Sequence, residues 1–346
     1  IPGDLSTECL EKSSDQERTG AMGNKLFVVA FDTSNYKTSV AIVQRNGSII
    51  ADLRRLLHVK QGERGLRQSE AIFQHMENLP LLIRELFTLI NGDEVAAVAA
   101  SDKPRQIEGS YMPCFKAGDA FGSTLASALG VPFFRFSHQE GHLEAVKEYS
   151  VFKNEDRYLA LHLSGGTTEI LKVAPHIEII GGTKDISFGQ TIDRAGVLLG
   201  MSFPCGEEMD AIAMKEGNAT KLFKPITIEG SYINLSGLDT QVKRTIGIMK
   251  AEGSLTERMI IGIIKEIFDK IAQCLIQLIK TSTDQEGINK VLMAGGVSSS
   301  KYIRSSINQH FKDGGVFVDF GSHELASDNA VGIGHLGRKS LWPEDR

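Results

Sequence analysis

The sequence has few cysteines and no long apolar run, and both absences exclude classes of protein. Its four cysteines, Cys9, Cys114, Cys205 and Cys274, stand far apart without any C-x-x-C pair. This spacing argues against a disulfide scaffold or a thiolate zinc site and fits a reducing cytoplasm. Charged residues interrupt the apolar stretches within about a dozen positions, whereas a membrane helix needs about 20 apolar residues. We therefore expect a cytoplasmic protein with no membrane contact.

The chain also lacks an excess of positive charge, because its formal net charge is −5. This balance gives no overall attraction to nucleic acid, so a polyanion would have to be met by a local basic patch or by other subunits. Residues 1–21 are polar and contain no signal-peptide core, and Met22 stands just before the first strand-like segment. We interpret these first residues as a tail, either natural or added.

What is present is the composition of a globular protein, with 41% apolar and 23% charged residues. A chain of 346 residues is long for one core and predicts two domains. Strand-like segments alternate with helical ones, which favours layered α/β domains. We expect a flexible tail at 1–24, a first lobe at 25–155 and a second lobe at 156–346.

One hairpin pattern occurs twice. The segments LFVVAFDTSNYKTSVAIV and RYLALHLSGGTTEILKVA each consist of an apolar strand, a short polar turn and a second apolar strand. The turn that begins at Asp32 and the turn that begins at Ser164 lie about 130 residues apart, which indicates one architectural unit present twice.

Two glycine-bearing loops in the second half are candidates for phosphate binding. In LSGGTTE, adjacent glycines let backbone N–H groups converge on an anion, although an ordinary hairpin turn would use the same residues. In VLMAGGVSSS, Gly295 and Gly296 stand between a strand and a helix that Ser298 to Ser300 can cap. The N-terminus of that helix can then face a nucleotide.

Two histidines four residues apart are the candidate metal ligands. In FSHQEGHLEAV, a helix places His138 and His142 on one face. Two imidazoles suit Fe or Zn, and a carboxylate from elsewhere would leave coordination positions open. A pair with a purely structural role is the alternative, and Asp328 can equally be a helix cap. The glutamate of this segment is Glu140, one position away from its place in H-E-x-x-H, so a protease would lack its general base.

Two carboxylates are candidates for nucleotide contacts. Asp193 and Asp210 flank the segment LLGMSFPCGEE, and either can accept hydrogen bonds from a ribose or an adenine. Solvated surface carboxylates are the alternative.

These segments together resemble the tRNA threonylcarbamoyladenosine synthase family, once labelled an O-sialoglycoprotein endopeptidase. The resemblance runs from about residue 26 to about residue 340. It is carried, in the family's order, by DTSNYKTSVAIV, SHQEGH, LSGGTTEIL, TIDRAGVLLGMSFPCG, INLSGLDT, VLMAGGVSSS and SDNA.

The resemblance implies a two-lobed α/β fold of the actin/Hsp70/sugar-kinase type, with duplicated ribonuclease-H-like domains and a ligand cleft between them. It implies one Fe²⁺ or Zn²⁺ ion held by His138, His142 and Asp328, and an adenylate or ATP as ligand. Members of the family transfer the threonylcarbamoyl group from threonylcarbamoyl-AMP to the adenosine beside the anticodon of tRNA, with accessory protein subunits. The positions that match the family's nucleotide-contacting stretches are His162, Leu163, Ser164, Gly165, Gly166, Asp193, Gly206, Asp210 and Ser300.

The chain departs from the family pattern around this site. Tyr36 and Lys37 replace an acidic pair, Thr167 replaces a histidine, and Ser300 replaces an asparagine. The family's Gly-Pro-Gly loop is also replaced, at 103–112. Three hypotheses follow: a metal-dependent threonylcarbamoyl transferase acting on tRNA, a divergent carbamoyltransferase or ATPase with another acceptor, or a non-catalytic subunit of such a complex. The matching metal ligands argue against the third.

Overall fold

The computed structural model describes residues 25–345, except for residues 35, 60–65, 175 and 323. The expected tail at 1–24 lies outside the described residues. No helix within the described part of the chain is long and apolar enough to cross a membrane.

The first lobe is built on a sheet that has five strands in the described residues, in the order β3-β2-β1-β4-β5. Strands β1 and β2 form the first expected hairpin, and β1 is almost entirely buried, which explains its unbroken apolar run. The strands span Phe27–Thr33 (β1), Lys37–Gln44 (β2), Ile49–Leu56 (β3), Val95–Lys103 (β4) and Phe133–Ser137 (β5).

The second lobe repeats this arrangement. Its sheet runs β12-β11-β6-β7-β8-β10-β9, so β8-β7-β6-β11-β12 has the same order and strand directions as the first sheet. The duplication expected from the two hairpin patterns is confirmed. The strands span Tyr158–Leu163 (β6), Thr168–Val173 (β7), Ile177–Thr183 (β8), Ile228–Glu229 (β9), Tyr232–Ile233 (β10), Lys290–Ala294 (β11) and Phe317–Asp319 (β12).

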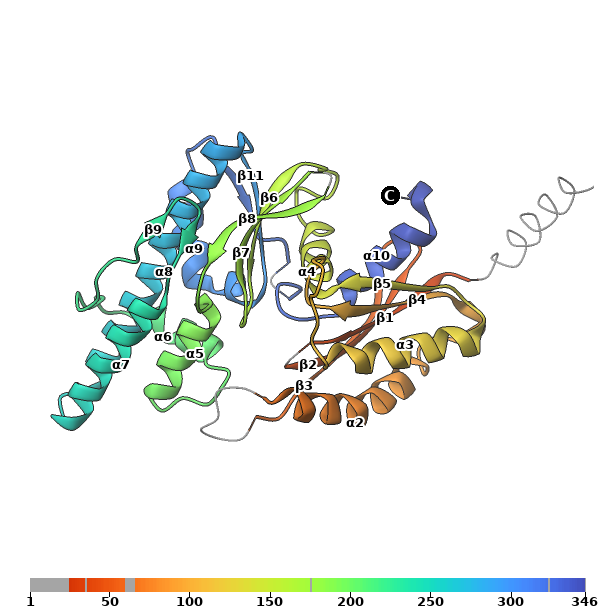
Figure 1. Cartoon of the computed structure of the whole chain (residues 1–346), viewed down its shortest axis with the longest axis horizontal. Helices are drawn as coiled ribbons and strands as arrows, with labels where there is room; N and C mark the ends of the chain where they lie inside the picture. Colours follow the sequence, from red (N-terminus) through yellow and green to blue (C-terminus); the bar gives the residue numbers. More distant parts are fainter. Residues whose placement is uncertain (1–24, 35, 60–65, 175, 323, 346) are drawn as a thin grey trace, which may run out of the picture.

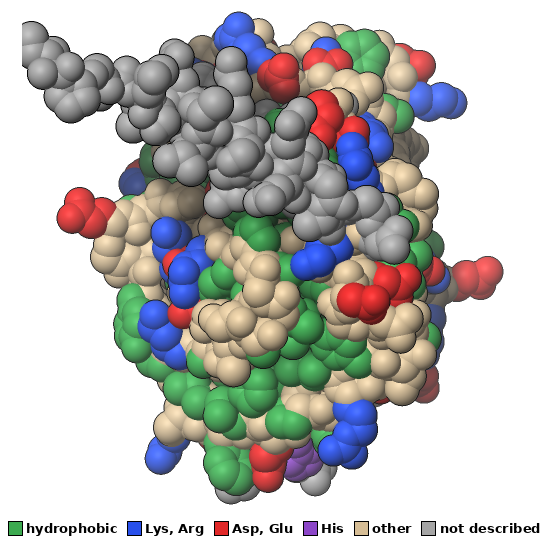
Figure 2. Space-filling view, turned by 90° about the vertical axis from the view of Figure 1, so that its right-hand side faces the viewer, with side chains coloured by type: hydrophobic (Ala, Val, Ile, Leu, Met, Phe, Trp, Pro, Cys, Tyr) green, Lys and Arg blue, Asp and Glu red, His purple; other side chains and the backbone are tan. Residues whose placement is uncertain are grey.

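Helices cover the outer face of each sheet (Figure 1). In the first lobe these are α2 (Gln68–Leu86) and α3 (Phe115–Leu129), and α2 continues through Pro80. Several large apolar side chains of α2, including Phe73, Met76 and Leu81, remain exposed. Figure 2 shows hydrophobic side chains gathered low on this lobe, at the height of α2 and α3. The helices of the second lobe are α5 (Phe188–Leu198), α6 (Gly206–Ala213), α7 (Ser236–Ala251), α8 (Glu257–Glu286) and α9 (Lys301–Phe311).

Two helices, α4 (His138–Lys147) and α10 (Val331–Leu341), lie between the sheets. Leu143 and Val146 of α4 pack on the second sheet. Val331 and Ile333 of α10 pack on the first sheet, so the last helix of the chain belongs to the core of the first lobe. The expected division at residue 155 therefore does not describe the C-terminal helix, because the apolar face of α10 is buried against β1 and β4.

The helices α4 and α10 cross closely because each has a glycine at the contact. A Cβ atom added to Gly332 would lie 1.9 Å from the carbonyl oxygen of Gly141, far inside van der Waals contact. Gly334 makes a similar approach to the first sheet, where a Cβ would lie 2.6 Å from Cγ2 of Val43. The distance between α4 and α10 is therefore set by the absence of side chains.

A buried charge cluster also joins the ends of these two helices. Glu148 is 5% exposed, and its carboxylate lies 2.7 Å from Nζ of Lys153 and 2.8 Å from Nζ of Lys339. Nη2 of Arg338 lies 3.4 Å from Oε1 of Glu148. Burial by itself would raise the pKa of Glu148, but the hydrogen bonds from Lys153 and Lys339 lower it from 4.5 to about 2.

Glu148→Gln should lower the free energy of unfolding at pH 7 by about 1–3 kcal/mol, because Arg338 and Lys339 lose a charged hydrogen-bond partner while Lys339 keeps its contact with Glu144. The folded-state pKa of Glu148 is below its unfolded value, so its ionised form stabilises the fold above pH 4.5 and loses this effect as the pH falls towards about 2. Urea unfolding between pH 7 and pH 3 should therefore show the gap between the two proteins narrowing with acidity. Equal stability at pH 7, or a loss matched by the exposed control Glu252→Gln, would contradict this role.

Candidate metal and nucleotide site

The two histidines of the sequence motif lie in the first two turns of α4. Ser137 caps this helix, and its hydroxyl accepts a hydrogen bond from the backbone N–H of Glu140 at 3.2 Å. The Glu140 carboxylate accepts hydrogen bonds from the backbone N–H and the hydroxyl of Ser137, both at 2.7 Å. Glu140 therefore completes a capping box and is not available as a general base for proteolysis.

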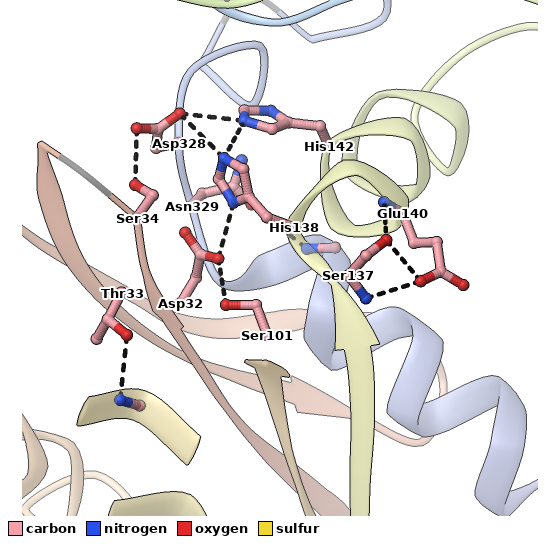
Figure 3. A network of polar contacts seen from close by, with 12 residues as sticks. Asp32, Thr33, Ser34, Ser101, Ser137, His138, Glu140, His142, Asp328 and Asn329 are labelled. Carbon is pink, nitrogen blue, oxygen red and sulfur yellow. Dashed lines mark hydrogen bonds and ion pairs between the residues drawn. The ribbon is translucent and has the colours of Figure 1, made fainter. Parts of the chain in front are cut away.

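Asp328 meets these histidines from the loop before α10 (Figure 3). Its carboxylate Oδ1 lies 3.0 Å from Nε2 of His142 and 3.7 Å from Nε2 of His138, and the two Nε2 atoms are 2.9 Å apart. The alternative role of Asp328 as a helix cap falls to Asn329, whose Oδ1 accepts a hydrogen bond from the N–H of Val331 at 2.9 Å. The predicted set of three is thus brought together.

The chemistry of these atoms fits a divalent metal. Asp32, at 0% exposure, lies 2.8 Å from Nδ1 of His138 and holds the proton on that nitrogen, so Nε2 is the atom that a metal would bind by displacing its proton. Ser34 donates to Oδ2 of Asp328 at 2.8 Å, which leaves Oδ1 directed at the histidines. Ligands at about 2.1 Å from one ion lie about 3.0–3.4 Å apart, close to the observed separations.

The electrostatics of the cluster follow from its burial. Burial would lower the pKa of His138, but the carboxylates of Asp32 and Asp328 raise it to about 9. Burial and the neighbouring His138 lower the pKa of His142 to about 4. Burial would raise the pKa of Asp328, yet its hydrogen bond with His142 and the charge of His138 hold it well below its usual range.

Sequence reasoning did not single out Asp32 and Ser34 as functional residues. Asp32 is the second-last residue of β1, next to β4, whose Ser101 also donates to Asp32 at 2.6 Å. The sequence did contain one signal for Asp32, since this carboxylate directly follows the apolar run FVVAF. Its partner, His138, is 106 residues away in the chain, so the pairing was not visible in the sequence.

Lys37, one of the departures from the family pattern, lies beside this cluster. Its Nζ donates to the hydroxyl of Ser327 at 3.0 Å, adjacent to Asp328. Burial lowers the pKa of Lys37, and the Asp328 charge opposes that effect. The replacement therefore adds a cationic side chain next to the ligand loop.

The predicted glycine turn joins β6 and β7 and lies at the start of α5. Ser164 and Thr167 close the turn between β6 and β7 with a backbone hydrogen bond of 2.9 Å. Gly165 lies against the start of α5, where Ser187 donates to its carbonyl at 2.7 Å. A Cβ added at Gly189 would lie 2.6 Å from Cα of Gly165, so the turn packs directly on the helix terminus.

A pocket of about 130 Å³ lies beside this turn. It includes Gly165 and Asp193, two of the predicted nucleotide contacts, and it is also lined by Tyr36 and Phe203, whose ring centroids are 5.3 Å apart. Burial raises the pKa of Asp193. The pocket is lined by Tyr36, Gly165, Gln190, Asp193, Arg194 and Phe203.

Other predicted contacts have structural partners. Asp210 accepts hydrogen bonds from the hydroxyl of Ser300 and from the backbone N–H groups of Lys301 and Tyr302. It therefore stabilises the start of α9, which Ser300 caps as expected by accepting from Ile303. Contacts from Asp210 and Ser300 to a nucleotide stay a prediction. Gly206 begins α6, while His162 and Leu163 are buried in β6.

The profile of the family described as "tRNA N6-adenosine threonylcarbamoyltransferase" matches residues 50–335. The chain belongs to this family. It is 27% identical over 329 residues to the tRNA N6-adenosine threonylcarbamoyltransferase of Christiangramia forsetii, covering 93% of this chain and 95% of that protein. It is 28% identical over 318 residues to the protein of the same name from Thermotoga neapolitana, covering 90% and 93%.

Solved structures with low sequence identity share the fold of this threonylcarbamoyltransferase-family chain. The activator of 2-hydroxyisocaproyl-CoA dehydratase from Clostridium difficile superposes with a TM-score of 0.55 at 12% identity, covering 92% of this chain and 97% of that one. HypF of T. kodakarensis gives a TM-score of 0.56 at 12% identity, covering 93% and 49%. Together with the repeated sheet order, they confirm the two-lobed actin-like fold predicted from the sequence.

Asp32→Asn should weaken Zn²⁺ binding by about 10–100-fold, because the neutral amide no longer holds Nδ1–H of His138 as a carboxylate does. Competition with a chromophoric chelator measures this change. Asp210→Asn is the matched control, since Asp210 bonds to α9 away from the histidines, and its affinity should equal that of the unaltered protein. Equal affinities in both variants would remove Asp32 from the metal site.

Gly332→Ala should weaken Zn²⁺ binding and lower the melting temperature, because its methyl group would force α10 away from α4 and shift Asp328 from the histidines. Gly247→Ala in α7 is the control, since a Cβ there meets open space and should raise helix stability by up to about 1 kcal/mol. Thermal unfolding and the same chelator assay measure both effects. A Gly332→Ala protein as stable and as well loaded as the original would contradict the glycine contact.

Proposed function

We propose that this chain is a metal-dependent transferase that moves the threonylcarbamoyl group from threonylcarbamoyl-AMP to the adenosine beside the anticodon of tRNA. The observation that carries the proposal is the meeting of His138, His142 and Asp328 within 4.8 Å, in a chain of the threonylcarbamoyltransferase family. The ion is Fe²⁺ or Zn²⁺, since two imidazoles and one carboxylate suit both.

The surrounding residues hold the ligands in the form that binding needs. Asp32 keeps the proton of His138 on Nδ1, and Ser34 fixes the carboxylate of Asp328. A bound ion would supply polarisation of the carbamoyl carbonyl, where the acceptor amine forms the new C–N bond as the C–O bond to AMP breaks and AMP leaves. Lys37 places a positive charge beside this centre, where it can offset negative charge on an adenylate.

We propose the β6–β7 turn and the pocket beside it as the place of the adenylate. The glycines Gly165 and Gly166 leave the backbone open to a phosphate, and Asp193 can accept hydrogen bonds from a ribose. The pocket of about 130 Å³ is smaller than the roughly 300 Å³ of a typical ligand site. Separation of the Tyr36 and Phe203 rings would enlarge it, so these side chains would move when the adenylate binds.

Accessory subunits belong to this proposal as well. The chain is acidic overall, with a formal net charge of −5, so tRNA binding gains from a partner that contributes basic surface. The exposed apolar side chains Phe73, Met76 and Leu81 on α2 give such a partner a surface to bind.

A second candidate is the same chemistry with another acceptor. It is favoured by Tyr36 and Lys37, which make the first turn aromatic and cationic where the family pattern that the chain resembles is acidic. In this case the metal and adenylate sites keep their roles, and the acceptor is a different carbamoyl or phosphoryl acceptor.

Cells depleted of their own threonylcarbamoyl transferase and supplied with this chain and its organism's partner proteins should regain threonylcarbamoyl-adenosine in tRNA. Nucleoside mass spectrometry measures it. His142→Ala should abolish the modification, because it removes a metal ligand, whereas His310→Ala, at an exposed position of α9, should leave it unchanged. A folded, metal-loaded protein that restores nothing would reject tRNA as acceptor and favour the second candidate.

A further inference from the structure

The loop between β4 and α3 (residues 104–114, the β4–α3 loop) exposes two large apolar side chains. Tyr111 is 61% exposed and Ile107 is 48% exposed. Residues that bind substrates are often found on loops that a rigid scaffold positions. This loop also falls within the segment 103–112, where the chain departs from the family pattern, so its side chains are particular to this chain.

Both ends of the β4–α3 loop lie against the metal-ligand helix α4 or its histidines. The carbonyl oxygen of Pro104 accepts a hydrogen bond from the N–H of Gln139 in α4 at 3.0 Å. At the other end, the ring centroid of Phe115 is 5.6 Å from that of His138. Tyr111 stands four residues before Phe115, so their Cα atoms are at most roughly 15 Å apart. The exposed tyrosine is therefore held at the border of the metal-ligand cluster.

Hydrogen bonds within the β4–α3 loop fix its shape. The N–H of Ser110 donates to the carbonyl oxygen of Ile107, and the N–H of Arg105 donates to the hydroxyl of Ser110, both at 3.0 Å. Gly109 has a φ of +76°, which glycine adopts without steric cost. Nε of Arg105 lies 2.9 Å from Oε1 of Glu169 in β7, which ties the loop to the second lobe. A loop that is fixed before binding loses little conformational freedom when a ligand binds.

The charge of this segment is opposite to that of the whole chain. Residues 103–116 contain three basic residues, Lys103, Arg105 and Lys116, and one acidic residue, Glu108, whereas the chain has a formal net charge of −5. Arg105 pairs with Glu169, so Lys103 and Lys116 are the cations that can meet a phosphate. Basic side chains beside an exposed aromatic ring are the combination that binds single-stranded nucleic acid.

We propose that the β4–α3 loop is the surface on which this chain binds an unpaired loop of its RNA acceptor. The ring of Tyr111 stacks on a base, and Lys103 and Lys116 pair with phosphates. RNA loops are commonly recognised in this way, because their unstacked bases are free to lie on aromatic side chains. This inference rests on the proposed function and deepens it, since it names the part of this chain that holds the RNA beside the metal ligands.

The position of Tyr111 favours RNA over the adenylate as its partner. The pocket proposed for the adenylate is lined by Tyr36, Gly165, Gln190, Asp193, Arg194 and Phe203, a set that includes no residue of the β4–α3 loop. A small nucleotide binds in a concave pocket, whereas an exposed ring on a loop suits a base presented by a longer strand.

Binding of a fluorescently labelled RNA stem-loop with unpaired adenosines tests the proposal, measured by anisotropy on the full chain with and without its organism's partner proteins. Tyr111→Ala should weaken binding by about 10–100-fold, because it removes the stacking ring from an exposed position. Tyr111→Phe keeps the ring and should bind like the original chain. Tyr232→Ala is the matched control, since Tyr232 is a 38% exposed tyrosine on β10 of the second lobe and should not affect binding.

The salt dependence of the same binding tests the lysines. Lys116→Gln should reduce the slope of log affinity against log salt concentration by about 0.7, because one phosphate contact is lost. Lys312→Gln removes the same charge from an exposed position at the end of α9 and should leave the slope unchanged. Zn²⁺ affinity should be the same in all these variants, since none alters a metal ligand.

Equal RNA affinity in Tyr111→Ala and the original chain would overturn the proposal. Unchanged RNA affinity together with weaker binding of AMP, measured by equilibrium dialysis, would instead place Tyr111 at the adenylate. An original chain that binds no RNA, with or without the partner proteins, also rejects the inference. If cells supplied with that chain regain no threonylcarbamoyl-adenosine, the proposed function fails with it. Full restoration by Tyr111→Ala, with unchanged RNA affinity, rejects this inference alone.

Discussion

The close crossing of α4 and α10 is the constraint on which the site depends. Gly141 stands directly before His142 on one helix, and Gly332 lies four residues after Asp328 on the other. Because no side chain separates the two backbones at this point, the loop that carries Asp328 reaches histidines 186 and 190 positions earlier in the chain. A larger residue at either glycine would separate the helices and the ligands together.

The same crossing explains why the site lies between the lobes and draws on both. Helix α4 packs on the second sheet through Leu143 and Val146, while α10 completes the core of the first. Asp32 therefore comes from the first sheet, the glycine turn at Gly165 comes from the second, and the ligands stand between them. The pocket at Gly165 and the cluster of His138, His142 and Asp328 therefore depend on how the two sheets pack against α4 and α10.

Much of the fold was visible in the sequence because it depends on local patterns. The two apolar hairpin patterns predicted the duplicated sheets, and the four-residue spacing of His138 and His142 predicted that both lie on one face of a helix. The carboxylates were harder to assign. Asp193 lines the pocket, whereas Asp210 accepts hydrogen bonds from the start of α9. The spacing of residues in the sequence does not show which way each carboxylate points, so it could not separate these two roles.

Sequence patterns are sufficient to predict the fold class, the family and the histidine pair, because strand alternation, helical period and ordered motifs are properties of neighbouring residues. The carboxylates that join the histidines become known only from the packing of distant segments. Asp32 contacts His138, which is 106 residues away in the sequence. Asn329 bonds to the start of α10, so Asp328 can face the histidines. The last helix, α10, packs in the core of the first lobe. These outcomes depend on burial and on contacts between distant segments, which exist only once the two sheets have packed against α4 and α10.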